Sequence, residues 1–271
     1  MINNKVEDYF VQLAGLLEKM EVTCYIAGSY AMGLYIEGTS DLDITFIFKH
    51  ENYMDNKNTI LRHAEQFKLE LDLMFFCENE IFMNPSSKQV REGILSPKVN
   101  GRLFWGKNVL DSWNLPSPKD YIESTIDLTL DFIKEARGLN YLDLPINYPN
   151  ENDYFKGYIR SRRGKISTKL LVCIYTWIAG CRLAVEKGLY MPSKYDVVSE
   201  YKKHYDDGEY LATLLRYCRD QWGYNIPTDD KGLTLLHHYC AEALTWEKRF
   251  IDDIYIENNK VNTLIGGFQN G

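Results

Sequence analysis

The chain has 271 residues, of which 45% are hydrophobic, and it carries a formal net charge of −7. This length admits one large domain or two ordinary ones, and the acidic balance disfavours a nucleic-acid partner while it accommodates a cationic molecule. No apolar run is long enough to span a bilayer, the N-terminus lacks the features of a signal peptide, and the six cysteines form no C-x-x-C pair. We therefore expect a protein of the reducing cytoplasm with no membrane partner.

Helical and extended segments alternate through the first 110 residues or so. The first 20 residues carry apolar side chains at helical spacing. Runs rich in β-forming residues follow at 22–28, 42–48 and 68–76, with a polar helical stretch between the second and the third and one more short strand near 101–110. This alternation is typical of an α/β or α+β sheet domain.

The composition changes after residue 114. "NLPSP" at 114–118 reads as a linker, in which Ser117 suits a helix N-cap and Pro118 a first helical position. Apolar residues then recur at helical spacing to the end of the chain's ordered part, with helices expected from Pro118, around 170–185, and near 195–204, 209–222 and 232–256. We expect an α+β protein with a mixed-sheet domain at 1–114, an all-α helical bundle at 115–257 and a flexible tail at 258–271.

Four acidic residues lie at the starts of two of the expected strands. Asp41 and Asp43 are two residues apart, as are Glu70 and Asp72, and residues two apart in a strand point to the same side. Carboxylates that converge at the edge of an apolar sheet repel one another and lose hydration, so they need compensation. Oxygen ligands of this kind suit magnesium, and two such ions about 3.5–4 Å apart can clamp both oxygens of a phosphoryl displacement.

A Gly-Ser pair precedes these acids. Gly28 permits close approach of the backbone to a phosphate, and the Ser29 hydroxyl can donate a hydrogen bond to it. Ser40, directly before Asp41, is a further candidate phosphate ligand.

The order Gly28-Ser29, Gly33, Ser40-Asp41-x-Asp43 resembles the signature of the nucleotidyltransferase superfamily related to DNA polymerase β. The resemblance implies a mixed-sheet fold in which Asp41 and Asp43 bind metal. A third carboxylate from a later strand would be both a metal ligand and the general base that deprotonates an acceptor hydroxyl. Asp72 in "LDLMFF" fits this role and is favoured, and Glu70 in "KLELDL" is the alternative.

The helical half is similar, more loosely, to that of the spectinomycin and streptomycin adenylyltransferases. The resemblance rests on the passage that links the domains and on the segment from Leu170 to Tyr205. It implies that Lys194 contacts the phosphates of a nucleotide from the second domain. The family's arginine in the preceding helix aligns near Ala179 and Gly180, so that Arg182 is its nearest counterpart here.

Together these features predict an enzyme that uses ATP and two magnesium ions to move a nucleoside monophosphate onto a hydroxyl of a small cationic molecule. The resemblance points to an aminoglycoside-type acceptor and hence to antibiotic resistance as a role, with the protein a monomer or a dimer. Two alternatives stay open, namely transfer to a protein or tRNA, and a nucleotide-binding module without turnover.

Overall fold

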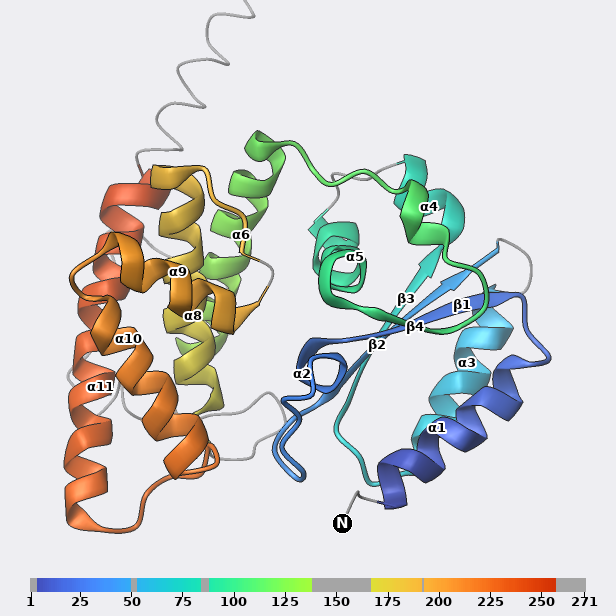
Figure 1. The fold of residues 1–271 in the computed structure, drawn as a ribbon, viewed down its shortest axis with the longest axis horizontal. Helices are drawn as coiled ribbons and strands as arrows, with labels where there is room; N and C mark the ends of the chain where they lie inside the picture. The colour runs from blue at the N-terminus through green and yellow to red at the C-terminus, as the bar shows by residue number, and fades with distance from the viewer. Residues whose placement is uncertain (1–3, 50–52, 84–87, 138–166, 192, 257–271) are drawn as a thin grey trace, which may run out of the picture. The chain divides into compact units, whose positions relative to one another are not determined.

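The computed structural model describes residues 4–49, 53–83, 88–137, 167–191 and 193–256. The chain divides into two compact units, Met1–Ser117 and Pro118–Gly271, close to the boundary expected at residue 114 (Figure 1). A mixed sheet lies in the first unit and the second is helical in its described part, so the expected α+β fold class is confirmed. The tail expected at 258–271 lies outside the described residues.

The N-terminal unit contains four strands, which correspond to the four expected runs. Its elements are α1 (Asn4–Leu17), β1 (Val22–Ala27), α2 (Gly28–Ala31), β2 (Leu42–Phe48), α3 (Tyr53–Ala64), β3 (Leu71–Cys77), α4 (Glu78–Met83), α5 (Lys88–Asn100), β4 (Arg102–Trp105) and the 3-10 helix η1 (Val109–Ser112). The strand order is β3-β2-β1-β4. Strands β2 and β3 are parallel, while β1 pairs antiparallel with both β2 and β4.

Side chains that alternate along the strands fill two separate cores, one on each face of the sheet. On one face, Ile44 and Phe46 of β2 pack with residues of α1 and α3. On the other face, Tyr25 of β1 and Ile47 of β2 pack with residues of α4, α5 and η1 (Figure 1). The central strands are therefore covered on both sides, as their unbroken apolar runs require.

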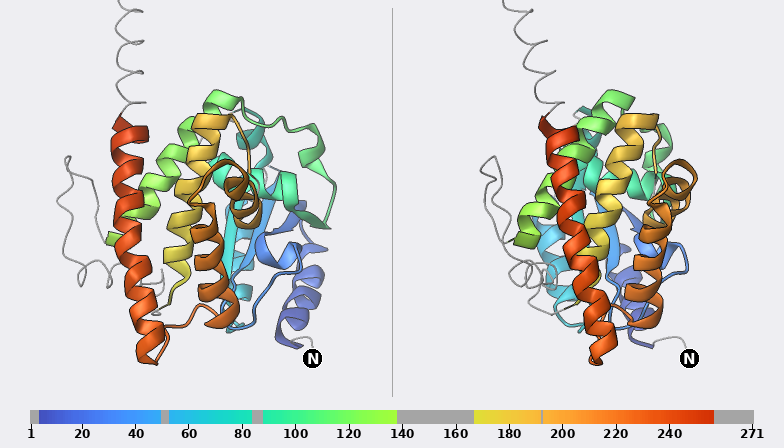
Figure 2. Two further views of the ribbon diagram at one scale, coloured as in Figure 1. Left: turned by 60° about the vertical axis from the view of Figure 1, so that its left-hand side comes forward. Right: turned by 90° about the vertical axis from the view of Figure 1, so that its left-hand side faces the viewer.

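The C-terminal unit is built around α8, a helix that is buried along most of its length. Its elements are α6 (Pro118–Arg137), α8 (Lys169–Lys187), α9 (Lys194–His204), α10 (Gly208–Leu215), the π-helix η2 (Arg216–Gln221), α11 (Asp230–Arg249) and the π-helix η3 (Phe250–Tyr255). Helix α8 contacts α6, α9, α10 and α11 (Figure 2). A helix that is apolar on most of its circumference needs such neighbours. No helix in the described ranges combines the length and the apolar character that crossing a membrane requires.

Two helices depart from expectation at their C-terminal ends. The sequence predicts plain helices near 209–222 and 232–256, but each ends in a π-helical segment, η2 and η3. A π-helical turn adds a residue to the helical repeat without changing which residue types are apolar, so hydrophobic spacing does not reveal it.

His63 gives the N-terminal unit a pH-dependent stability. Its ring stacks on Tyr9 of α1 with centroids 5.6 Å apart and meets Phe67 edge-on. Burial lowers the pKa of His63, and a hydrogen bond with the Tyr9 backbone opposes this only in part. The folded unit therefore favours the neutral imidazole.

We predict that the free energy of unfolding falls as the pH drops below about 6.5, the ordinary pKa of histidine. The unfolded chain binds a proton there that the folded His63 resists, and the loss continues until the folded-state pKa is passed. Chemical denaturation of wild type and His63→Phe between pH 7 and pH 5 measures this pH dependence of the free energy of unfolding. A variant of the exposed His237 is the control. A pH slope that is equal in wild type and His63→Phe would contradict this assignment.

Candidate active site

Three aspartates meet where β2 and β3 begin. Asp41 directly precedes β2, Asp43 is its second residue, and Asp72 is the second residue of β3. The parallel register pairs Asp43 with Asp72 directly. One carboxylate oxygen from each of the three lies within 4.8 Å of the other two.

Bringing these charges together is unfavourable without a cation. At an effective dielectric constant of about 20, two full charges at such a separation repel by about 3 kcal/mol. Each aspartate is half-buried, which weakens the compensation that water gives. Three convergent carboxylate oxygens form a hard donor set that suits Mg²⁺. The donor chemistry of this group therefore fits the divalent metal that the sequence implied.

Gly28 lies directly against this group at the end of β1. Its neighbour Ala27 pairs with Asp43 across the antiparallel ladder, and Gly28 itself has φ +62°. A Cβ at Gly28 would stand 1.8 Å from Asp43 Oδ2, a separation that no side chain can adopt. The absence of a side chain at Gly28 thus leaves room for the Asp43 carboxylate. This is a reason for glycine at position 28 in addition to the expected close approach of a phosphate to the backbone.

The Ser29 hydroxyl is a candidate ligand-binding group beside the aspartates. Its Oγ is buried and has no hydrogen-bond partner among the described residues. A buried polar atom left without a partner costs about 1–3 kcal/mol, so such atoms commonly mark a place for water or a bound molecule. Ser29 follows Gly28 in α2 and hence lies beside the aspartates.

Ser40 stabilises the loop that leads into Asp41. Its Oγ accepts a hydrogen bond from the Ile36 backbone N–H at 2.9 Å, and its own N–H donates to the Ile36 carbonyl at 2.8 Å. Both bonds close a turn and fix the chain just before Asp41. Residue spacing alone did not reveal this task, and the expected phosphate contact of Ser40 stays a prediction.

Glu70 does not belong to the group of three. Strand β3 begins at Leu71, so the strand alternation that would put Glu70 on the face of Asp72 does not reach it. Its backbone carbonyl instead accepts a hydrogen bond from Leu42 N–H at 2.8 Å and so extends the pairing of the two strands. Of the two candidates for the third carboxylate, the structure brings Asp72 to Asp41 and Asp43.

Tyr35 is a neighbour of the site that sequence reasoning missed. Burial raises the pKa of its hydroxyl, and the nearby carboxylates of Glu37, Asp41 and Glu70 raise it further. Its ring also meets Tyr30 edge-on, with centroids 5.6 Å apart. A single tyrosine in a loop carries no pattern that would have pointed to this position.

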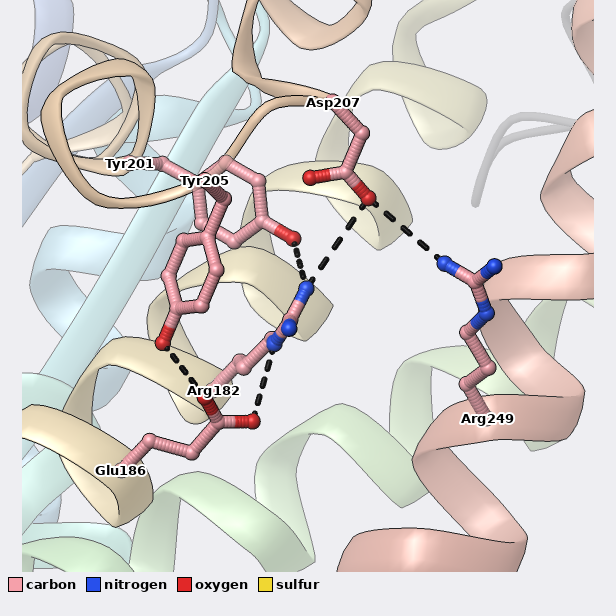
Figure 3. Close-up of polar contacts among 6 residues, drawn as sticks. All are labelled: Arg182, Glu186, Tyr201, Tyr205, Asp207 and Arg249. Atoms are coloured by element: carbon pink, nitrogen blue, oxygen red, sulfur yellow. Dashed lines mark hydrogen bonds and ion pairs between the residues drawn. The ribbon is translucent and has the colours of Figure 1, made fainter.

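Arg182, in the second unit, is held in a network inside that unit (Figure 3). Its Nε donates to Glu186 Oε1 at 2.9 Å and its Nη1 to the Tyr201 hydroxyl at 2.8 Å. The guanidinium also lies 3.8 Å from the centroid of the Tyr205 ring. Asp207 Oδ2 lies 3.9 Å from Arg182 Nη1 and 3.6 Å from Arg249 Nη1. These contacts tie α8 to α9, and the expected nucleotide contact of Arg182 stays a prediction.

Lys194 is the first residue of α9, as its expected place on a helix-opening turn requires. Ser193 caps the helix, since its Oγ accepts from the Asp196 backbone N–H at 3.2 Å. The Lys194 Nζ donates to Cys173 Sγ of α8 at 3.0 Å. Lys194 and Arg182 thus lie in the helical unit, and the aspartates, Gly28, Ser29 and Ser40 lie in the sheet unit.

Comparison with known proteins agrees with the prediction that the N-terminal unit is similar to nucleotidyltransferases. Residues 5–95 match the family described as "Nucleotidyltransferase domain", and this range includes the three aspartates, Gly28 and Ser29. The search of curated protein sequences found no match. The match covers the sheet unit, and it supports an enzyme that transfers a nucleotide.

Among solved structures, the chain is similar to spectinomycin adenyltransferase AAD(9) from Enterococcus faecialis, whose structure was determined with ATP and spectinomycin. The identity is 13% and the TM-score 0.49, over 89% of this chain and 97% of that chain. At these values the likeness does not carry the ligands of that enzyme over to this chain.

The contact between Gly28 and Asp43 can be tested with a pair of glycine variants. Gly33 has φ +72° but no atom within 4 Å of a Cβ built on it, so Gly33→Ala carries backbone strain alone. We predict that Gly33→Ala costs about 1–2 kcal/mol of stability and that Gly28→Ala costs about 1–3 kcal/mol more.

Because the added methyl group must displace the Asp43 carboxylate, Gly28→Ala should also weaken Mn²⁺ or Mg²⁺ binding, and Gly33→Ala should leave it unchanged. Thermal unfolding and metal titration measure both effects. Equal losses in the two variants would mean that the close approach has no consequence.

Proposed function

We propose that this chain uses ATP and Mg²⁺ to transfer AMP onto a hydroxyl group of a small cationic molecule such as an aminoglycoside. The observation that carries the proposal is the convergence of Asp41, Asp43 and Asp72, within 4.8 Å of one another, inside the residues matched as a nucleotidyltransferase domain. Few protein functions other than metal-dependent phosphoryl chemistry require three clustered acids.

Asp41, Asp43 and Asp72 would hold the magnesium, with two ions as the sequence suggests. When bound, the metal neutralises charge that develops on the phosphate and on the attacking and leaving oxygens. Gly28 leaves Asp43 the room to take part, and Ser29 has a buried hydroxyl to donate to a phosphate oxygen. Ser40, Lys194 and Arg182 remain proposed phosphate ligands from the resemblance.

The transfer itself exchanges one phosphorus–oxygen bond for another. The acceptor hydroxyl oxygen bonds to the α-phosphorus of ATP, and the bond from that phosphorus to the bridging oxygen of the β-phosphate breaks, so pyrophosphate leaves. The hydroxyl proton passes to Asp72, which acts as the general base. Glu70 lies outside the group of aspartates and is the weaker candidate for this step.

Negative charge around the site supports a cationic acceptor. The chain has a net charge of −7. Glu37 and Glu70 add carboxylates near Asp41, and all three act on the Tyr35 hydroxyl. An ammonium-bearing molecule is attracted to such a rim, and an aromatic ring beside it adds a surface for a cation. The six buried free cysteines suit the reducing cytoplasm proposed for the protein.

The proposal predicts pyrophosphate release from ATP that depends on a cationic acceptor. A screen of each nucleoside triphosphate against aminoglycosides and other amino-sugars should find such a pair. Asp43→Ala should lower the rate at least 1,000-fold while the melting temperature stays within a few degrees, because it removes a ligand and no core contact. An Asp43→Ala protein with full activity would refute the proposal, and label transferred to a protein or tRNA would redirect it to a macromolecular acceptor.

The identity of the general base is tested by a matched pair of isosteric variants. Asp72→Asn should lower kcat by about 100-fold to 10,000-fold, because the amide can neither take the proton nor bind metal well. Glu70→Gln should leave kcat within about threefold and raise KM for the cationic acceptor, because it removes only a charge at the rim. The reverse result would make Glu70 the general base.

A further inference from the structure

A lysine and a cysteine lie in direct contact inside the helical unit. The Lys194 Nζ, at the start of α9, donates a hydrogen bond to the Cys173 Sγ of α8 at 3.0 Å. Lys194 is half-buried, and Cys173 is buried but keeps an exposed fraction of 8%. An amine and a thiol, which can be joined once the sulfur is oxidised, are thus held at contact distance.

The packing of α8 against α9 fixes this contact. A Cβ built on Gly180 of α8 would stand 3.3 Å from Val197 Cγ2 of α9, so the two helices approach each other closely there. Further along, the Arg182 Nη1 of α8 donates to the Tyr201 hydroxyl of α9 at 2.8 Å. Because both helices are held by these contacts, the amine and the thiol have little freedom to separate.

Positive charge lies near the thiol. Burial raises the pKa of the Tyr224 hydroxyl, Lys194 lowers it, and Cys173 raises it, so the three groups lie near one another. Arg219 also lowers that pKa and is a second cation in the same region of the unit. Cysteines that react with oxidants characteristically lie beside cations, which favour the thiolate. The surroundings of Cys173 are therefore of the kind that supports oxidation.

The other five cysteines lie in surroundings that oppose oxidation. Burial raises the pKa of the thiol in each of them, namely Cys24, Cys77, Cys181, Cys218 and Cys240. A thiol that stays protonated is a poor nucleophile toward peroxide. Cys181 gives a matched comparison, because it lies about two turns further along the same helix and is fully buried. Peroxide should therefore select Cys173.

We propose that peroxide converts this contact into a covalent bond between Cys173 Sγ and Lys194 Nζ. Hydrogen peroxide first oxidises the thiol to a sulfenic acid. Sulfur loses two electrons to the peroxide, whose O–O bond breaks, and one water is released. The lysine nitrogen then bonds to sulfur in place of the hydroxyl group, which gives a sulfenamide. Of the two protons that the ammonium loses, one leaves with the hydroxyl group as water and the other passes to solvent.

The bond is a reversible modification that changes the charge of the unit. The nitrogen of a sulfenamide lacks the positive charge of an ammonium, so the link removes the charge of Lys194. Two thiol molecules restore the thiol and the amine and are themselves oxidised to a disulfide. The formation of the link depends only on the contact in the helical unit. Its effect on nucleotide binding rests on the function proposed above, in which Lys194 is a phosphate ligand.

The test treats the full chain with hydrogen peroxide, blocks the remaining thiols and digests the protein with trypsin in the absence of reductant. Mass spectrometry should find residues 170–182 joined to residues 188–202, with a mass two hydrogen atoms below the sum of the separate peptides. The bond after Lys194 stays intact in this product, because trypsin cleaves after unmodified lysine and arginine. Reduction with dithiothreitol before digestion should abolish the joined peptide.

Variants assign the bond to its two residues. Cys173→Ser and Lys194→Arg should each abolish the joined peptide, because serine lacks the sulfur and a guanidinium keeps the charge without the amine. Cys181→Ser, the matched control, removes the other cysteine of the same peptide and should form the link as wild type does. If peroxide leaves Cys173 of wild type reduced, oxidises it only to sulfinic acid or joins it to another cysteine, the inference is wrong.

A calorimetric titration with ATP and Mg²⁺ separates this inference from the proposed function. The linked protein should bind ATP about tenfold or more weakly than the reduced protein, while peroxide should leave the affinity of Cys173→Ser unchanged. If the linked protein binds ATP as tightly as the reduced one, the link stands and the phosphate role of Lys194 is refuted. If wild type transfers AMP and forms no link, the inference fails and the function stands. If the link forms and no nucleotide is transferred, the function fails and the link stands.

Discussion

The site depends on a strand register that forces like charges together. Asp43 and Asp72 are direct partners across two parallel strands, and their oxygens and those of Asp41 are held where they repel. That arrangement persists because the same register buries Ile44 and Phe46 in one core and Ile47 and Phe76 in the other. A slip of one residue would send every side chain of β3 to the opposite face. The apolar cores therefore supply the free energy that keeps three acids at one sheet edge.

The neighbouring backbone is adapted to the same group. Gly28 has no room for a side chain because the Asp43 carboxylate lies where its Cβ would be. Ser40 closes the turn before Asp41 with two hydrogen bonds to Ile36. Since β1 ends, and β2 and β3 begin, at this one edge, the segment that follows one strand and the segments that precede two others meet there. Local turn chemistry and sheet topology thus select the same position.

Residue spacing predicted the elements of the fold and the convergence of the aspartates. The runs at 42–48 and 68–76 are rich in β-forming residues, and each begins with acids two residues apart, so both the existence of these strands and the shared face of Asp41 and Asp43 follow from the sequence. The choice between Glu70 and Asp72 did not follow, because it depends on the residue at which β3 begins, and strand ends are set by pairing with the neighbouring strand. The strand begins at Leu71, which excludes Glu70 from the alternation.

Contacts between distant segments were beyond prediction for a related reason. The turn-closing role of Ser40, the network around Arg182 and the position of Tyr35 each depend on side chains brought together by tertiary packing. The π-helix at Arg216–Gln221 and the positive φ of Tyr224 leave the apolar pattern unchanged. The contact of the Arg219 guanidinium with the Tyr195 ring, 5.2 Å from its centroid, likewise joins residues that are far apart in the sequence.

Net charge is a guide to long-range attraction and a poor guide to a single site. A value of −7 disfavours an extended phosphate backbone, whose binding requires many cations along one surface. A nucleoside triphosphate is different, because its charge is concentrated within a few bonds. Three carboxylates able to hold metal ions are enough to engage such a molecule, whatever the rest of the surface carries. An acidic protein can thus combine a nucleotide with a cationic acceptor, because short-range groups bind the first while the wider field attracts the second.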